Sequence, residues 1–149
     1  MKTNYISILF ALIFGIFLPM SLRAQDTDLI IIRNEVSVPS EMDLSQLKSV
    51  LRGEKYRWKD GSKVVVALMK TNTPVGTNTC RKLYNMSSNE LNKYFLALVF
   101  QGKVKAPTFF NSESELASFV AETPGAIGVL QNVYEIPVKT ILVDGKKQI

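Results

Sequence analysis

Three short runs of β-branched and other apolar residues alternate with helical patterns, and this alternation most restricts the fold. The runs cover residues 28–32, 62–69 and 126–130. Short, nearly continuous apolar runs of this kind are typical of strands buried on both faces of a sheet. Their alternation with helices predicts a small α/β fold, with helices packed over a central, mostly parallel sheet.

Capping residues mark where two of the helices begin. Asp43 is an N-cap residue type before an amphipathic segment, and Gly53 stands where a glycine commonly ends a helix. Ser87 and Glu90 have the spacing of a capping box, and the apolar residues after them repeat at helical intervals. We therefore expect helices to begin at Asp43 and at Ser87.

The remaining segments carry weaker signals. Ser112 and Glu115 predict a second capping box, and a polar, turn-rich stretch becomes helical from about Thr77. Residues 136–145 predict a last strand with a turn.

The N-terminus carries an uncharged apolar run. Lys2 is followed by 14 apolar or uncharged residues, 5–18, and then by Pro19. A transmembrane helix needs roughly 20 apolar residues, so the run fits the central region of a secretory signal peptide better. We expect residues 1–24 to be a signal peptide, cleaved after Ala24 and leaving no stable membrane span; an uncleaved anchor is the alternative. Residues 25–149 then form one domain in the periplasm.

The charge balance gives little reason to expect nucleic acid as a partner. The chain has 18 basic and 13 acidic residues, and removal of residues 1–24 leaves a net charge of +3. A nucleic-acid-binding domain usually has a stronger basic excess on one face.

The residue inventory argues against catalysis. The chain has no histidine, and Cys80 is its single cysteine. A Ser-His or Cys-His nucleophile is excluded, and no spacing indicates a metal site or a cofactor. We therefore expect that the protein is not an enzyme. Cys80 is interpreted as filling a small apolar space, with a reactive or intermolecular thiol as the alternative.

The segment Arg52–Lys63 contains the single tryptophan among basic residues. It links a predicted helix to a predicted strand. We expect Trp58 and Tyr56 to cover the edge of the core while the basic side chains remain solvated; a ligand-stacking role is the alternative.

Several motifs in this order resemble the type II periplasmic solute-binding proteins, in particular the phosphate-binding family of phosphate ABC transporters. Leu51, Gly53, Trp58, Asp60 and Gly61 match that family's "F-x-G-x-x-x-x-W-x-D-G" pattern, with leucine in place of phenylalanine. A Gly-Thr loop and a "PGAIG" strand, residues 124–128, follow at similar spacing. The resemblance covers nearly all of residues 28–131. It implies one lobe of a two-lobed binding fold, since the family's full members are commonly about twice as long.

The resemblance also implies a ligand, phosphate or a related small oxyanion, delivered to an ABC transport system. The residues themselves point to a place for it, where Gly76 permits close backbone approach at an expected helix start. Unpaired amides and hydroxyls there would bind an anion, with Arg81 or Lys82 adding charge. The predicted ligand-binding residues are Thr73, Gly76, Thr77, Asn78 and Thr79.

Two alternatives remain open at this point. The first is that Thr77 or Asn78 simply caps its helix without any ligand, because every helix needs its N-terminal donors satisfied. The second is that the whole chain is a non-catalytic interaction or adaptor domain, which binds a partner protein of the cell envelope and no small ligand.

Overall fold

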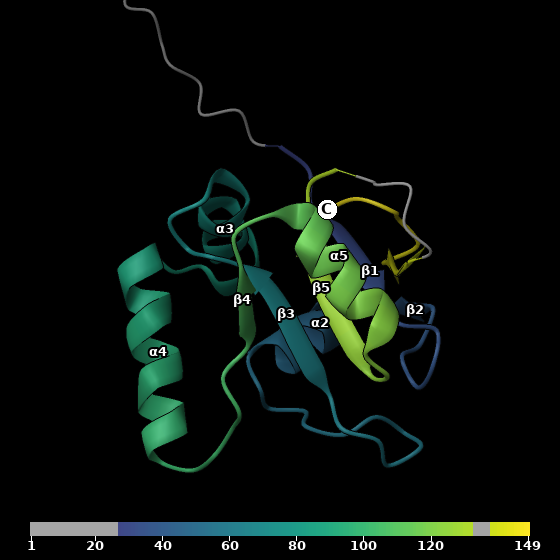
Figure 1. Ribbon diagram of the computed structural model, residues 1–149, viewed down its shortest axis with the longest axis horizontal. Coiled ribbons are helices and arrows are strands. Elements are labelled where there is room, and N and C mark those ends of the chain that lie inside the picture. The colour runs from purple at the N-terminus through teal and green to yellow at the C-terminus, as the bar shows by residue number, and fades with distance from the viewer. Residues whose placement is uncertain (1–26, 133–137) are drawn as a thin grey trace, which may run out of the picture.

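A computed structural model describes residues 27–132 and 138–149 of the chain (Figure 1). The predicted signal peptide, residues 1–24, lies outside these ranges. The strands and helices, in chain order, are β1 (Ile30–Arg33), β2 (Glu41–Met42), α2 (Leu44–Leu51), β3 (Val65–Met69), α3 (Pro74–Thr79), the π-helical turn η1 (Cys80–Tyr84), α4 (Ser88–Phe100), β4 (Thr108–Phe110), α5 (Glu113–Glu122), β5 (Ala126–Leu130), β6 (Lys139–Thr140) and β7 (Leu142–Val143).

The central sheet has the strand order β4-β3-β5-β1-β6. β3 pairs in parallel with β4 and β5, whereas β1 pairs antiparallel with both β5 and β6. The strands β3, β4, β5 and β6 therefore point the same way, and β1 is reversed. The prediction of a mostly parallel sheet under helices is confirmed.

Helices cover both faces of this sheet. Figure 1 shows α5 in front of the sheet and α2 behind it. All five residues of β5 are buried, as are Ile30–Ile32 of β1, so the centre of the sheet is the core of the molecule. α5 lies close to β5, because a Cβ at Gly128 would be only 2.6 Å from Leu116 Cδ2.

The predicted helix starts at Asp43 and Ser87 are confirmed, and each is closed by two reciprocal hydrogen bonds. Gln46 N–H donates to the Asp43 carboxylate at 2.7 Å, and Asp43 N–H donates to Gln46 Oε1 at 3.2 Å. Ser87 N–H likewise donates to Glu90 at 2.7 Å. Gly53 adopts φ +78° one residue after the C-cap of α2, as its position predicts.

The second predicted capping box forms only in part. Glu115 N–H donates to Ser112 Oγ at 3.3 Å, which caps α5. The return bond from Ser112 N–H to Glu115 is absent from the described residues. Ser112 has φ −128°, whereas the fully boxed Ser87 has φ −71°, and this more extended backbone directs its N–H elsewhere.

The tail departs from the single predicted strand over residues 136–145. Residues 136–137 lie outside the described ranges, and the remainder forms two strands in different sheets. β6 joins the central sheet beside β1, while β7 pairs in parallel with β2. The fully buried Ile141 lies between them, so the chain crosses from one sheet to the other while keeping this side chain in the core.

Trp58 has the structural role expected for it, and Tyr56 does not. The Trp58 side chain is buried, and its Nε1–H donates to the Gly125 carbonyl at 2.8 Å. Tyr56 is 69% exposed, and only its backbone is fixed, through the Val64 N–H. The expectation that Tyr56 covers the core is wrong.

In the described part of the chain, no helix combines the length and the apolar character that a membrane crossing requires.

Candidate functional site

Three helices begin at one edge of the central sheet. β3 and β4 are parallel, so α3, which follows β3, and α5, which follows β4, both start beyond the carboxyl ends of these strands (Figure 1). The first residue of α4 lies there too, since Ser88 Oγ donates to the Thr71 carbonyl at 2.7 Å. The positive ends of three helix dipoles therefore meet at this carboxyl edge, where open α/β sheets commonly bind ligands.

α3 begins earlier than predicted. Its first residue is Pro74 and its N-cap is Thr73, so Thr77 is already in the helix and its N–H donates to the Thr73 carbonyl at 2.8 Å. The prediction of free amides at Thr77, Asn78 and Thr79 is therefore wrong. The pair Thr73-Pro74 carried the signal that sequence reasoning missed, because threonine is a good N-cap and proline favours the first helical position.

The close backbone approach expected at Gly76 does occur, but the chain itself makes it. A Cβ at Gly76 would be 2.0 Å from the Lys70 carbonyl oxygen. Thr73 Oγ1 donates to that same oxygen at 2.7 Å and accepts from Gly76 N–H at 3.0 Å. The glycine is thus accounted for by a tight turn, and its amide is already capped.

The other predicted residues also bond within the chain. Asn78 Nδ2 donates to the Thr27 carbonyl at 2.6 Å, and Thr79 Oγ1 donates to the Val75 carbonyl at 2.8 Å. Both residues are buried. Thr77 is exposed at the carboxyl edge, and its Oγ1 donates to the Thr71 carbonyl at 3.0 Å.

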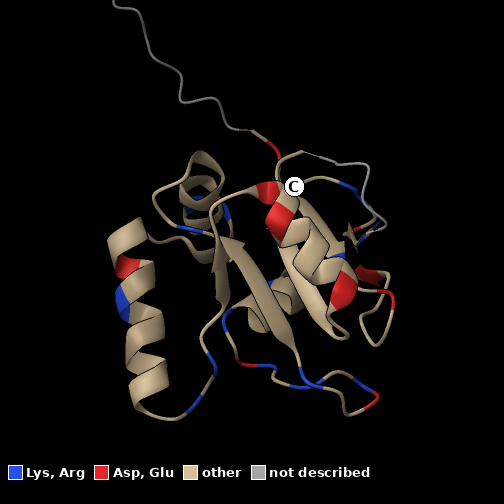
Figure 2. Cartoon of the chain, viewed as in Figure 1, with Lys and Arg blue, Asp and Glu red and all other residues tan. Residues whose placement is uncertain are grey.

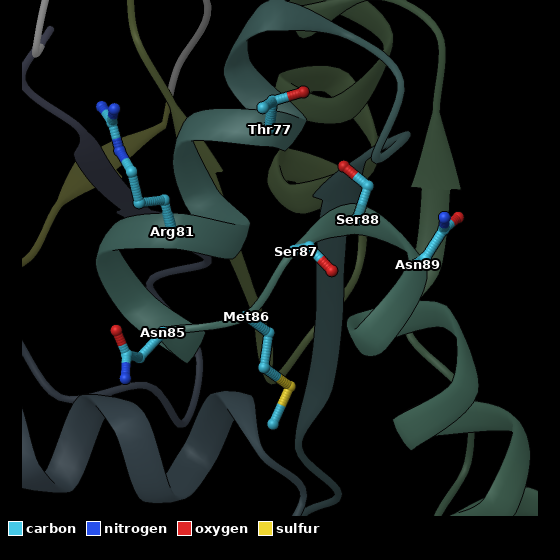
Figure 3. A pocket seen from close by; sticks show the side chains of 7 residues that line it. All are labelled: Thr77, Arg81, Asn85, Met86, Ser87, Ser88 and Asn89. Atoms are coloured by element: carbon cyan, nitrogen blue, oxygen red, sulfur yellow. The ribbon is translucent and has the colours of Figure 1, made fainter.

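An open pocket of about 600 Å³ adjoins this edge, between α3–η1 and the start of α4. Figure 3 shows the Thr77 and Ser88 hydroxyls directed toward the space between them, while Arg81 and Asn85 point away from it. The Thr71 carbonyl accepts from both hydroxyls. The lining residues are Thr77, Arg81, Asn85, Met86, Ser87, Ser88 and Asn89.

Sequence reasoning found Thr77 but did not include Ser87, Ser88 or Asn89 in the site. The capping-box pattern placed Ser87 at a helix start. No local signal shows that this start lies beside residue 77, because that depends on the packing of α4.

The charges around the edge distinguish its helix ends. No carboxylate lines the pocket, although the Glu90 carboxylate in the first turn of α4 accepts from the N–H of the lining residue Ser87 at 2.7 Å. At the start of α5, the Glu113 carboxylate accepts from Gln131 N–H at 2.6 Å and from Asn132 N–H at 3.1 Å. Glu113 thus binds amides that follow β5, and the pocket beside α3 and α4 is a part of the edge that no acidic residue lines.

The described residues include no group of three His, Cys, Asp or Glu side chains able to hold a metal ion. Cys80 is 1% exposed, as its apolar-filling interpretation requires, and burial raises the pKa of its thiol.

Similar folds are found among solved structures of phosphate receptors. An ABC-type phosphate transport receptor from Vibrio cholerae matches 83% of this chain and 49% of its own length, with a TM-score of 0.64 and 16% identity. A putative phosphate ABC transporter substrate-binding protein with bound phosphate from Clostridium perfringens matches 80% and 46%, at TM-score 0.60 and 16% identity. PstS from Borrelia burgdorferi matches 80% and 48%, at TM-score 0.60 and 19% identity.

The chain has the phosphate-receptor fold. It spans about half the length of these receptors. No family model and no curated protein matches the sequence.

Two motifs that carry the sequence resemblance to the phosphate-receptor fold meet in space. The Trp58 indole N–H bonds to the Gly125 carbonyl, which also accepts from Val65 N–H at 3.1 Å. The "W-x-D-G" segment and the first β3 residue thus both bond to the glycine that precedes the "PGAIG" strand β5.

Proposed function

We propose that the chain is an exported, non-catalytic solute-binding module of the periplasm that binds a small oxyanion, phosphate first. In this proposal residues 1–24 are its signal peptide and residues 25–149 form a single domain serving an ABC transport system. The observation that carries the proposal is the open pocket between the starts of α3 and α4, which lies at the carboxyl edge and has no acidic lining.

The chemistry of this pocket suits an anion bound weakly. The start of α3 supplies positive potential, whereas Glu90 offsets that of α4, and the Thr77 and Ser88 hydroxyls can turn from the Thr71 carbonyl toward a bound oxyanion. Each turn gives up a hydrogen bond with a net value of about 1 kcal/mol. An open pocket also leaves much of the ligand in water, whereas strong sites bury most of it. We expect dissociation constants in the millimolar range.

The names of two similar structures support the choice of ligand. One is called a phosphate transport receptor, and another was solved with bound phosphate.

Thermal unfolding with added anions tests the proposal. Phosphate at ten times its dissociation constant should stabilise the protein by about 1.4 kcal/mol, which raises the melting temperature by several degrees. The double substitution Thr77→Ala and Ser88→Ala should remove this shift. Ser118→Ala, an exposed hydroxyl on α5, is the matched control and should keep it. Sodium chloride at equal ionic strength is the reference. Melting temperatures in phosphate, sulfate and carboxylates that all equal the value in sodium chloride would refute oxyanion binding.

A second function, an adaptor domain for a cell-envelope protein, is favoured by one surface. Leu96, Val99 and Phe100 on α4 are 57%, 43% and 82% exposed. Their spacing places them on one face of the helix, and clustered apolar side chains mark contact surfaces. A photo-crosslinking residue at position 100 should then capture an envelope partner, while one at position 118 should not. Equal labelling at both positions would refute this function.

A further inference from the structure

A second concave surface lies at the opposite end of the central sheet from the pocket described above. It is a groove of about 530 Å³ between residues 55–57, the start of β3, and the loop 102–108 that leads into β4. The segment before β3 and the loop before β4 form its two walls. It lies at the amino ends of these parallel strands, away from Thr71 and α3.

The walls of this groove carry a strong excess of positive charge. Five of the chain's 18 basic residues line it, and none of the 13 acidic residues does. Within the described part of the chain, none of the five forms an ion pair. Figure 2 shows basic residues on both segments at this end of the sheet. The five are Lys55, Arg57, Lys63, Lys103 and Lys105.

The floor of the groove is apolar. β4 pairs with β3 only over Ala67–Met69, so the residues before Ala67 extend past the start of β4 and line the groove. Their side chains are only partly buried. Tyr56, 69% exposed, adds an aromatic ring. The aliphatic lining residues are Val50, Val64, Val65, Val66, Val104 and Ala106.

We propose that this groove binds an extended acidic segment of a partner protein, in which aliphatic side chains alternate with carboxylates. The carboxylates would meet the wall cations, which no described carboxylate neutralises, and the aliphatic side chains would cover the valines of the floor. An extended chain suits the site, because the first part of β3 has no β4 neighbour and offers a sheet edge.

Two other anionic partners fit the groove less well. Single-stranded nucleic acid is bound by successive aromatic side chains on which bases stack, and Tyr56 is the one aromatic residue that lines the groove. A flat bilayer surface could reach the lysines on the walls but would leave the concave apolar floor uncovered.

Fluorescence anisotropy with labelled decapeptides tests the proposal on the purified protein. The probe alternates Glu and Val; one comparison peptide replaces each Glu by Gln, and another replaces each Val by Ser. We expect the Glu/Val peptide to bind at least roughly tenfold more tightly than either comparison peptide. Replacing Lys103 and Lys105 by Glu should weaken its binding roughly tenfold, since each reversal loses one attraction and adds a repulsion. Replacing the exposed Lys146 and Lys147 by Glu makes the same change in net charge elsewhere and should leave binding unchanged.

Three results would overturn the proposal. The first is no binding of the Glu/Val peptide up to millimolar concentration. The second is equal weakening by the groove variant and the control variant, which would indicate net charge alone. The third is binding of the Glu/Ser peptide or of an oligothymidylate as tight as that of the Glu/Val peptide, which would show that the apolar floor takes no part.

Discussion

The substitution Gly76→Ala distinguishes two explanations of why a glycine stands at position 76. If Gly76 serves a ligand, alanine should leave the empty protein stable or improve it, since alanine is favoured over glycine in a helix by about 1 kcal/mol. If Gly76 serves the turn that enters α3, alanine should destabilise the protein without any ligand. The structure supports the second explanation, because the added Cβ would be 2.0 Å from the Lys70 carbonyl oxygen and 2.7 Å from its carbon.

The cost follows from what that carbonyl does. It must retreat by about 1 Å to bring the contact from 2.0 Å to a tolerable 3.0 Å. The same oxygen accepts from Thr73 N–H at 2.9 Å and from Thr73 Oγ1 at 2.7 Å, so retreat breaks or stretches both bonds. Two hydrogen bonds at about 1 kcal/mol each and about 1–3 kcal/mol of overpacking strain outweigh the gain in helix propensity. We expect a net loss of about 2–4 kcal/mol.

Urea and thermal unfolding, followed by circular dichroism without added anions, measure this loss. A net cost near 3 kcal/mol should lower the melting temperature by about 10 °C in a domain of this size. Gly61→Ala is the control: Gly61 has φ +87° and no atom within 4 Å of an added Cβ, so it should cost only the left-handed backbone penalty of about 1–2 kcal/mol. A Gly76→Ala protein as stable as the wild type would refute the packing explanation.

Three further predictions concern groups away from that turn. Trp58→Phe should lower the free energy of unfolding by about 1–3 kcal/mol, because it removes the indole bond to the Gly125 carbonyl and part of a buried ring; urea titration showing less than about 0.5 kcal/mol would contradict this. The pKa of Glu90 is lowered because Ser87 N–H donates to its carboxylate, so its charge stabilises the fold above its ordinary pKa of 4.5 and this contribution fades as the pH falls. Glu90→Gln should therefore show a smaller fall in melting temperature between pH 6 and pH 3 than the wild type, and an equal fall would count against the cap. Cys80 should react with Ellman's reagent roughly a hundredfold more slowly in the folded protein than in urea, since burial both shields the thiol and raises its pKa; comparable rates would show that it is accessible.

Local signals predicted the parts of the fold that local interactions determine. Asp43 and Ser87 bind amides within their own first helical turn, and such bonds can be recognised from residue type and spacing. Gly53 ends α2 for a reason that is equally local. The reversed direction of β1 has no comparable signal, because the run of isoleucines fits either orientation in a buried sheet.

The site was predicted less completely because its hydrogen bonds join distant segments. The Thr71 carbonyl accepts from Ser88 Oγ, 17 residues later, and Asn78 reaches the Thr27 carbonyl, 51 residues earlier. Hydroxyl and amide side chains near an expected helix start indicate the capacity to bind an anion. They do not show whether the chain's own carbonyls already accept hydrogen bonds from these side chains.

The two concave surfaces should act independently, because β3 separates them and water screens their charges. Thr71 lies two residues past the end of β3 and Val64 one residue before its start, a span of about 23 Å at roughly 3.3 Å per residue. That exceeds the screening length of about 8 Å at physiological salt. The Lys103→Glu and Lys105→Glu protein should therefore keep its phosphate-induced rise in melting temperature, and the Thr77→Ala and Ser88→Ala protein should keep its affinity for the Glu/Val peptide. Loss of both responses in either variant would show that the ends are coupled through the sheet, since direct electrostatics cannot act over that span.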